Sequence, residues 1–137
     1  MLAMNNFNEV TYTMDRYIIW IITGSIFAAL AVLFGAFGAH GLKSRVSAED
    51  LIIFETGVRY QMYHALALIL LGLLAMNPNT AITNLTFGLF VAGILIFSGT
   101  LYLIPLTGLR WLGAITPIGG TALIAGWISL IYNLIKY

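Results

Sequence analysis

The chain has 137 residues, of which 61% are hydrophobic and only 8% are charged, and its mean hydropathy is +0.97. Soluble domains carry about 25% charged residues, so this composition indicates an integral membrane protein rather than a soluble domain. The net charge of +1 comes from scattered cations, which argues against a nucleic-acid-binding protein, and the absence of cysteine excludes disulfide bonds and cysteine-ligated metals.

Four near-uncharged segments are each long enough to cross a bilayer, which needs about 20 apolar residues. They predict an all-α, integral membrane four-helix bundle, formed as a single domain by residues 14–137. The expected helices cover residues 17–39, 48–76, 85–106 and 111–135. Residues 1–13 form a polar N-terminal extension without helical periodicity, and disorder is one interpretation of this extension.

Small residues lie on one face of the first expected helix, since they recur at spacings of four and three. Such faces let membrane helices approach closely, although small residues are also common in membrane helices in general. We predict similar packing faces on the third and fourth helices. The predicted packing residues are Gly24, Ala28, Ala31, Gly35 and Gly38, then Gly88, Ala92 and Gly99, and finally Gly113, Pro117 and Gly120.

The second expected helix begins with a capping signal, because Ser47 is followed by the acidic residues Glu49 and Asp50. A helix over residues 48–76 would be about 43 Å long, whereas the hydrocarbon core is about 30 Å thick. We therefore expect an interfacial helical extension before transmembrane helix 2. The Asn-Pro-Asn stretch at residues 77–79 ends this helix, and Pro105 and Gly108 separate the third helix from the fourth.

The stretch FETGVRYQMYHALAL, residues 54–68, brings polar groups to the mouth of this second helix. At 100° per residue these groups cover most of the helix circumference, so neighbouring helices or the interface must surround them. Glu55 and Arg59 are four residues apart with the acid first, which favours an ion pair within the helix. We interpret the stretch as a plug of polar groups that bond to neighbouring helices.

Two histidines raise more specific alternatives. His40 follows the first helix and His64 lies in the second, so antiparallel packing would place both toward the same membrane side. They would then serve as axial haem ligands, as a metal site completed by Glu55, or as a proton relay. Neither histidine belongs to a diagnostic ligand spacing, and packing groups that form hydrogen bonds are the commoner case. We therefore expect no cofactor and no metal.

Lysine and arginine counts predict the orientation. Arg16 and Lys136 flank one side, whereas four cations flank the other: Lys43, Arg45, Arg59 and Arg110. Because the cytoplasmic side carries the excess, both termini are expected to be noncytoplasmic in a multi-pass protein of the plasma membrane.

Four blocks of sequence resemble the YgdD/YwdK family of small multi-span membrane proteins: GAFGAHGL (35–42), FETGVRYQMYHALAL (54–68), FSGTLY (97–102) and LGAITPIGG (112–120). The resemblance covers nearly everything after Met14. It implies a fold and a location in the membrane, but it implies no activity, because the family is known as a domain of unknown function. It also marks candidate polar site residues. These are His40, Glu55, Arg59, Tyr60, Gln61, Tyr63, His64, Ser98, Tyr102 and Thr116, with Pro117 beside them.

The sequence contains no nucleophile elbow, phosphate loop or dinucleotide fingerprint. The leading hypothesis is therefore a noncatalytic membrane protein that supports membrane integrity or homeostasis, alone or packed against a larger membrane complex. The alternative is a small transporter or proton-linked channel with its mouth at Glu55, Arg59 and His64. A third hypothesis is an enzyme acting on lipid or quinone, which would require a lateral opening beside His40, Glu55 and His64. Membrane lipids, a second copy or a larger complex are the expected partners, and nucleic acid is not.

Overall fold

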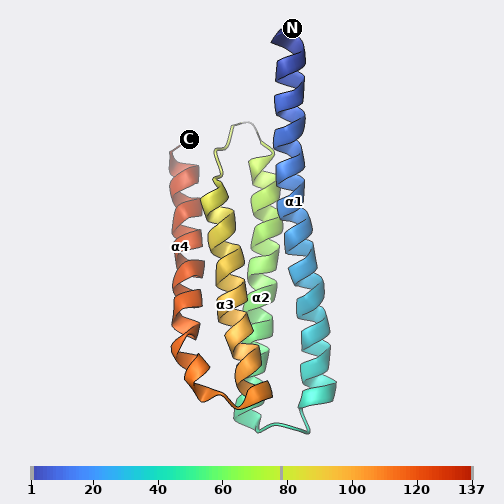
Figure 1. Ribbon diagram of the computed structural model, residues 1–137, viewed down its shortest axis with the longest axis vertical. Coiled ribbons are helices and arrows are strands. Elements are labelled where there is room, and N and C mark those ends of the chain that lie inside the picture. The colour runs from blue at the N-terminus through green and yellow to red at the C-terminus, as the bar shows by residue number, and fades with distance from the viewer. Residues whose placement is uncertain (1, 78, 137) are drawn as a thin grey trace.

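The computed structural model describes the backbone of residues 2–77 and 79–136 and the side chains of residues 17–77 and 79–136. Four long helices run alternately up and down (Figure 1). They are α1 (Leu2–Phe37), α2 (Ala48–Ala75), α3 (Asn84–Thr107) and α4 (Thr116–Ile135), with a short π-helix η1 (Gly38–Leu42) after α1 and a 3₁₀-helix η2 (Arg110–Ala114) before α4. The four predicted membrane spans are confirmed, and none of the described residues lies in a strand. Helix α1 begins at Leu2 rather than at the expected residue 17. The side chains of residues 1–16 are not described, so the interpretation of residues 1–13 as disordered stays a prediction.

Local chemistry explains where the helices begin and end. Ser47 caps α2 as expected, because its Oγ accepts a hydrogen bond from the backbone N–H of Asp50 at 3.1 Å. Helix α3 continues through Pro105 and ends at Gly108, whose φ of +74° is a left-handed conformation that glycine adopts readily. The long second helix is a single α-helix from Ala48, so its polar first turns extend the membrane span without a break.

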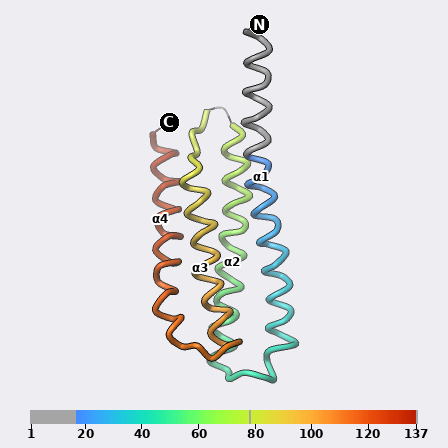
Figure 2. The backbone as a smooth tube through the Cα atoms, in the orientation of Figure 1, coloured from blue at the N-terminus to red at the C-terminus, as the bar shows by residue number. Residues whose placement is uncertain are grey.

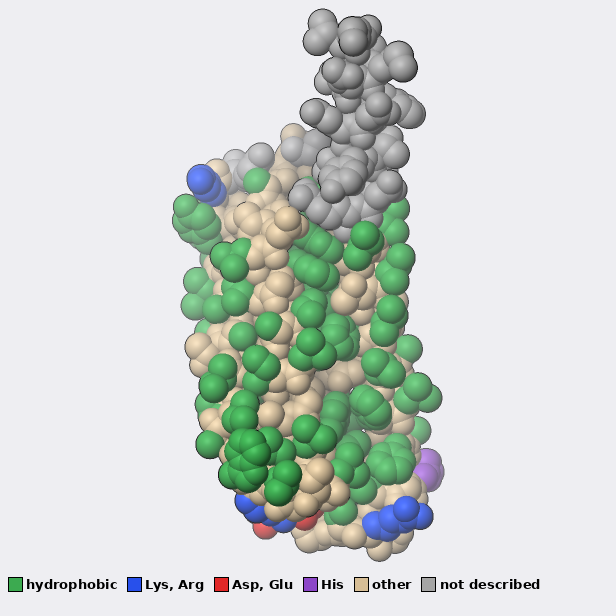
Figure 3. Space-filling view, viewed as in Figure 1, with side chains coloured by type: hydrophobic (Ala, Val, Ile, Leu, Met, Phe, Trp, Pro, Cys, Tyr) green, Lys and Arg blue, Asp and Glu red, His purple; other side chains and the backbone are tan. Residues whose placement is uncertain are grey.

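The helices form a staggered row in chain order, with α1 and α4 at its two sides (Figures 1 and 2). Helices α2 and α3 lie at the centre and bury the larger share of their residues. Side chains of α1 also reach α3, because Trp20 stacks on Phe87 with ring centroids 5.0 Å apart. Outward-facing side chains are mostly apolar, as a surface in contact with lipid requires (Figure 3).

Glycines set the closest helix contacts. A Cβ atom built on Gly24 would lie 2.7 Å from the carbonyl oxygen of Ala65, and one on Gly72 would lie 3.0 Å from that of Tyr17, so α1 and α2 approach closely there. Gly119 brings α4 against α3 in the same way, since its Cβ would lie 2.8 Å from the Cα of Phe97. These contacts confirm the principle of small-residue packing.

The predicted packing faces are right for α1 and wrong for α3. Gly24 and Ala31 of α1 and Gly38 at the start of η1 are buried. In α3, Cβ atoms at Gly88 and Gly99 would meet nothing within 4 Å, and the contact face instead carries Gly93. At 100° per residue, Gly88 and Gly99 lie 20° apart and Gly93 lies 120° from Gly99. The spacing rule detected a stripe of small residues, but it did not identify the stripe that faces the neighbouring helix.

The same correction applies in part to the fourth span. A Cβ at Gly113 would meet nothing within 4 Å and Pro117 is exposed, while a Cβ at Gly120 would make only an ordinary contact with Phe97 at 3.5 Å. The close contacts come from Gly119 and Gly126. Of the remaining predicted residues, Ala28 is half-buried and Ala92 is exposed, and a Cβ built on Gly35 would lie 3.4 Å from the side chain of Val58.

Candidate functional site

Gln61 links three helices in the middle of the bundle. It lies on α2 with only 3% of its surface exposed. Its Nε2 donates a hydrogen bond to the backbone carbonyl oxygen of Phe27 on α1 at 2.9 Å, and its Oε1 accepts one from the hydroxyl of Tyr102 on α3 at 3.0 Å. Buried polar groups need such partners, and hydrogen bonds between helices stabilise membrane bundles. The expected polar plug is therefore present at Gln61 and Tyr102.

His64, one turn further along α2, connects to α4. The indole N–H of Trp127 donates to Nε2 of His64 at 3.1 Å, and Nδ1 of His64 lies 2.8 Å from the backbone carbonyl oxygen of Tyr60. An indole N–H is only a donor, so Nε2 must be the unprotonated nitrogen and Nδ1 must carry the proton. The two contacts assign His64 as a neutral imidazole with both nitrogens occupied.

A second polar group near the other end of α3 and α4 was not predicted. The side-chain amide of Asn133 donates to Oγ1 of Thr86 at 2.8 Å, and Thr86 also bonds Ser129 at 2.7 Å. Thr86 is completely buried and Asn133 is 7% exposed. An amide in an otherwise apolar span is the sequence signal that would have indicated it, because such residues usually bond across helices.

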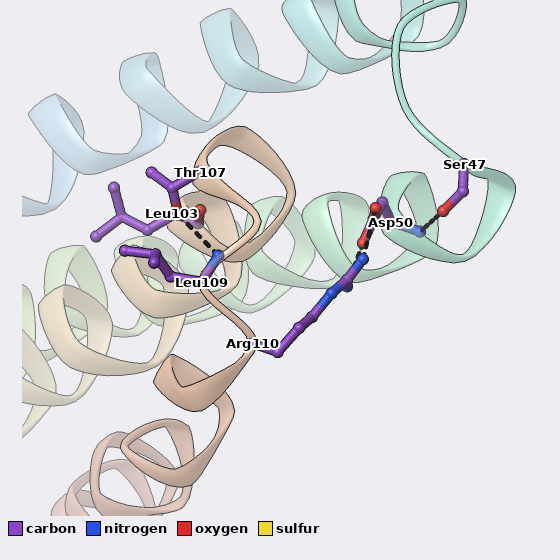
Figure 4. Close-up of polar contacts among 6 residues, drawn as sticks. All are labelled: Ser47, Asp50, Leu103, Thr107, Leu109 and Arg110. Atoms are coloured by element: carbon purple, nitrogen blue, oxygen red, sulfur yellow. Dashed lines mark hydrogen bonds and ion pairs between the residues drawn. The ribbon is translucent and has the colours of Figure 1, made fainter.

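An ion pair, also missed, joins the first turn of α2 to the connection between α3 and α4 (Figure 4). Arg110 donates from Nη1 to Oδ1 of Asp50 at 2.5 Å and from Nη2 to Oδ2 at 2.9 Å. This bidentate geometry suits the planar guanidinium. From the sequence, Asp50 was expected only to stabilise the N-terminus of α2. Arg110 was used only to predict the orientation of the protein in the membrane.

Glu55 and Arg59 do not form the predicted pair. Both side chains are exposed, and the guanidinium of Arg59 instead donates to the hydroxyl of Thr56 at 3.3 Å. Tyr60 and Tyr63 are also 41% and 56% exposed. These positions therefore lie on the outward side of α2, because Gln61 and His64 occupy the side that faces the other helices. Helical periodicity showed correctly that polar groups surround α2. We had expected too many of them to bond to neighbouring helices.

His40 is exposed in η1 and does not join His64. Helices α1 and α2 pack with Gly38 against Phe54 and with Phe27 against Gln61, so His40 lies level with the first turns of α2. At 1.5 Å per residue, that level is about 20 Å along the helix axis from His64. The paired haem site, the metal site and the relay between these two histidines are therefore not assembled. Among the side chains that the structure describes, no three His, Asp or Glu residues are grouped to hold a metal ion.

The last two candidate positions lie between α3 and α4. Thr116 bonds Thr100 through their hydroxyls at 2.8 Å, which joins the start of α4 to α3. Ser98 is 1% exposed, and its hydroxyl has no hydrogen-bond partner among the described residues.

Comparison with known proteins agrees with this architecture. Residues 34–120 match the family model described as "Protein of unknown function (DUF423)". The chain belongs to the DUF423 family. The matched segment includes all of η1, α2 and α3, and with them His40, Gln61, His64 and Tyr102.

Several relatives of this family are named membrane proteins. The chain is 46% identical over 120 residues to UPF0382 membrane protein YwdK of Bacillus subtilis (strain 168), covering 87% of this chain and 98% of that protein. It is 44% identical over 119 residues to a UPF0382 membrane protein of Staphylococcus epidermidis (strain ATCC 12228 / FDA PCI 1200), covering 87% and 97%. No solved structure matches the chain significantly. The resemblance to the YwdK family is thereby confirmed, and the protein is a multi-pass membrane protein.

Proposed function

We propose that the protein is a noncatalytic component of the bacterial plasma membrane that supports membrane integrity or homeostasis, alone or packed against a larger membrane complex. The main support for this proposal is that the buried polar groups of α2 form hydrogen bonds with neighbouring helices. Gln61 and His64 both bond to neighbouring helices, so their hydrogen-bonding groups hold the bundle together. A transport or catalytic role would instead need such groups to be available to a solute or substrate.

We also propose that the termini face away from the cytoplasm. Lys43, Arg45 and Arg110 lie in the connections at one end of the bundle, whereas Lys136 follows α4 at the other end. Figure 3 shows lysine and arginine side chains at both ends of the molecule. The positive-inside rule then places the end that carries Lys43, Arg45 and Arg110 in the cytoplasm. A reporter fused to the C-terminus that is active only outside the cytoplasm should give signal, whereas a cytoplasm-only reporter should not. The opposite pattern would reverse the orientation and leave the four-span fold intact.

The test of function compares a deletion strain with the same strain carrying the wild-type protein. Loss of the protein should increase uptake of a membrane-impermeant dye, and complementation should restore the barrier. Purified protein in sealed vesicles should leave an imposed pH gradient intact. Rapid collapse of that gradient by wild type but not by His64→Phe would refute the noncatalytic scaffold and support a proton-linked channel.

A further inference from the structure

An apolar groove runs between α1 and α3 with α2 as its floor. It consists of two adjoining cavities of about 390 Å³ and 200 Å³, which share Phe34, Gly99 and Tyr102 as lining residues. Its margins include Leu95 and Leu106, which are 59% and 52% exposed. The groove is therefore open toward the side of the bundle, where a membrane protein meets lipid.

Gly99 keeps this groove open. It lines both cavities, and a Cβ atom at this position would meet nothing within 4 Å. Close helix packing therefore does not require glycine at this position, unlike Gly72 or Gly119. Glycine lowers intrinsic helix stability relative to alanine. Its presence is explained if the space beside it is occupied by something other than a neighbouring helix.

The length of the groove matches one lipid leaflet. Along α3 its lining extends from Ile94 to Leu106, which is about 18 Å at 1.5 Å per residue. Half of a hydrocarbon core is about 15 Å. Trp111, which follows the end of α3 in η2, is exposed, and tryptophan is a residue type that marks the membrane interface. A chain entering at the outer end of the groove would reach the bilayer midplane, as a lipid acyl chain does.

Positive groups lie at the outer end of the groove. Phe37 and Leu106 line that end, and the chain continues from them into Lys43 and Arg110. Lys43 and Arg45 are exposed, and Figure 3 shows lysine and arginine side chains at this end of the molecule. Basic residues at a membrane surface attract anionic headgroups. The acids Glu49 and Asp50 are also at this end, but Asp50 is bonded to Arg110.

We propose that the groove between α1 and α3 binds one acyl chain of an anionic glycerophospholipid, whose phosphate lies beside Lys43 and Arg45. Bulk lipid solvates any membrane surface, whereas this groove holds one chain at a fixed place through its aromatic walls and the gap at Gly99. The inference goes beyond the proposed function, because lipid binding is measured directly and does not depend on whether the protein is noncatalytic.

Native mass spectrometry of the intact protein in mild detergent tests the proposal, with dioleoyl phosphatidylglycerol and dioleoyl phosphatidylcholine as probes. One phosphatidylglycerol should bind more tightly than phosphatidylcholine. Gly99→Leu fills the groove and should weaken binding of that lipid at least about tenfold, whereas Gly88→Leu, in the same helix and away from the groove, should not. Leu106→Trp at the outer end is a second blocking variant if Gly99→Leu does not fold.

Charge variants test the headgroup separately. Lys43→Gln and Arg45→Gln should each weaken phosphatidylglycerol binding about fivefold and leave phosphatidylcholine binding nearly unchanged. Lys136→Gln, at the opposite end, is the matched control and should have no effect. Equal lipid retention by Gly99→Leu, Leu106→Trp and Gly88→Leu would overturn the acyl-chain site. Equal binding of the two lipids by wild type would overturn the anionic headgroup.

Discussion

Trp127 on α4 donates its indole N–H to His64 on α2 across 3.1 Å, although α3 lies between these helices in the chain order. Phe90 of α3 packs against both rings, with centroids 5.8 Å from His64 and 5.1 Å from Trp127. These contacts therefore join α2, α3 and α4. One turn away on α2, the hydrogen bonds of Gln61 join α1, α2 and α3. Helix α2 takes part in both sets of contacts, which explains why the polar residues of the second span lie so close together in the sequence.

Trp127→Phe should destabilise the protein by about 0.6–1.7 kcal/mol, because it leaves Nε2 of His64 buried without its donor. His64→Phe combined with Trp127→Phe should cost less than the sum of the two single variants, since the double variant leaves no unpaired partner. Reversible unfolding in mixed detergent measures these energies. Trp111→Phe is the control, as Trp111 is 62% exposed and should tolerate the change. Strict additivity of the two substitutions would show that the hydrogen bond does not couple α2 to α4.

Tyr102→Phe should destabilise the bundle because it removes the donor to Oε1 of Gln61. Tyr63→Phe is the matched control, since Tyr63 is 56% exposed and, within the described part of the chain, its ring pairs with Tyr60 while its hydroxyl forms no hydrogen bond. We expect a loss of about 1 kcal/mol for Tyr102→Phe and little change for Tyr63→Phe, both measured by unfolding in the same detergent. Similar effects of the two variants would argue that the hydroxyl of Tyr102 contributes nothing through Gln61.

The sequence was sufficient to predict elements that depend on local composition. Four apolar runs gave four spans, and Ser47 identified the start of α2 through its own hydroxyl. Gln61 and His64 were recognised as polar groups needing protein partners, and both have them. One partner of Gln61 is Tyr102, which was among the candidate residues. The other partners, Phe27 and Trp127, belong to helices whose rotation the sequence does not specify.

Long-range pairings explain the remaining differences. The sequence favoured a pair between Glu55 and Arg59 because they are close in the chain, whereas the ion pair that forms joins Asp50 to Arg110 across the bundle end. Small residues on α3 were assigned to the wrong face for a similar reason, because helical periodicity gives the angle between residues without giving the direction of the neighbouring helix. Both errors concern tertiary contacts rather than helix formation.

Glu55→Ala and Arg59→Ala should each leave stability nearly unchanged, because the two side chains are exposed and do not pair with each other. The thermal midpoint in detergent should shift by no more than about 2 °C. The proposed packing against a larger complex predicts a different readout: these variants should copurify with less of any partner taken from native membranes. A large fall in the midpoint for either variant would show that the pair is buried and structural.

Close helix approach predicts that glycine substitutions will differ sharply by position. Gly72→Ala should destabilise the protein by about 1–3 kcal/mol, because its new Cβ would meet the backbone of α1 at Tyr17 and Ile21, and backbone cannot move aside like a flexible side chain. Gly119→Ala should do the same at the contact between α3 and α4. Gly88→Ala is the control for both, since its Cβ would meet nothing within 4 Å and alanine favours the helix. Unfolding in mixed detergent should therefore rank Gly88→Ala at or above wild type and the other two clearly below it. If Gly72→Ala and Gly119→Ala are as stable as Gly88→Ala, the helices are not held at the separations that these contacts require.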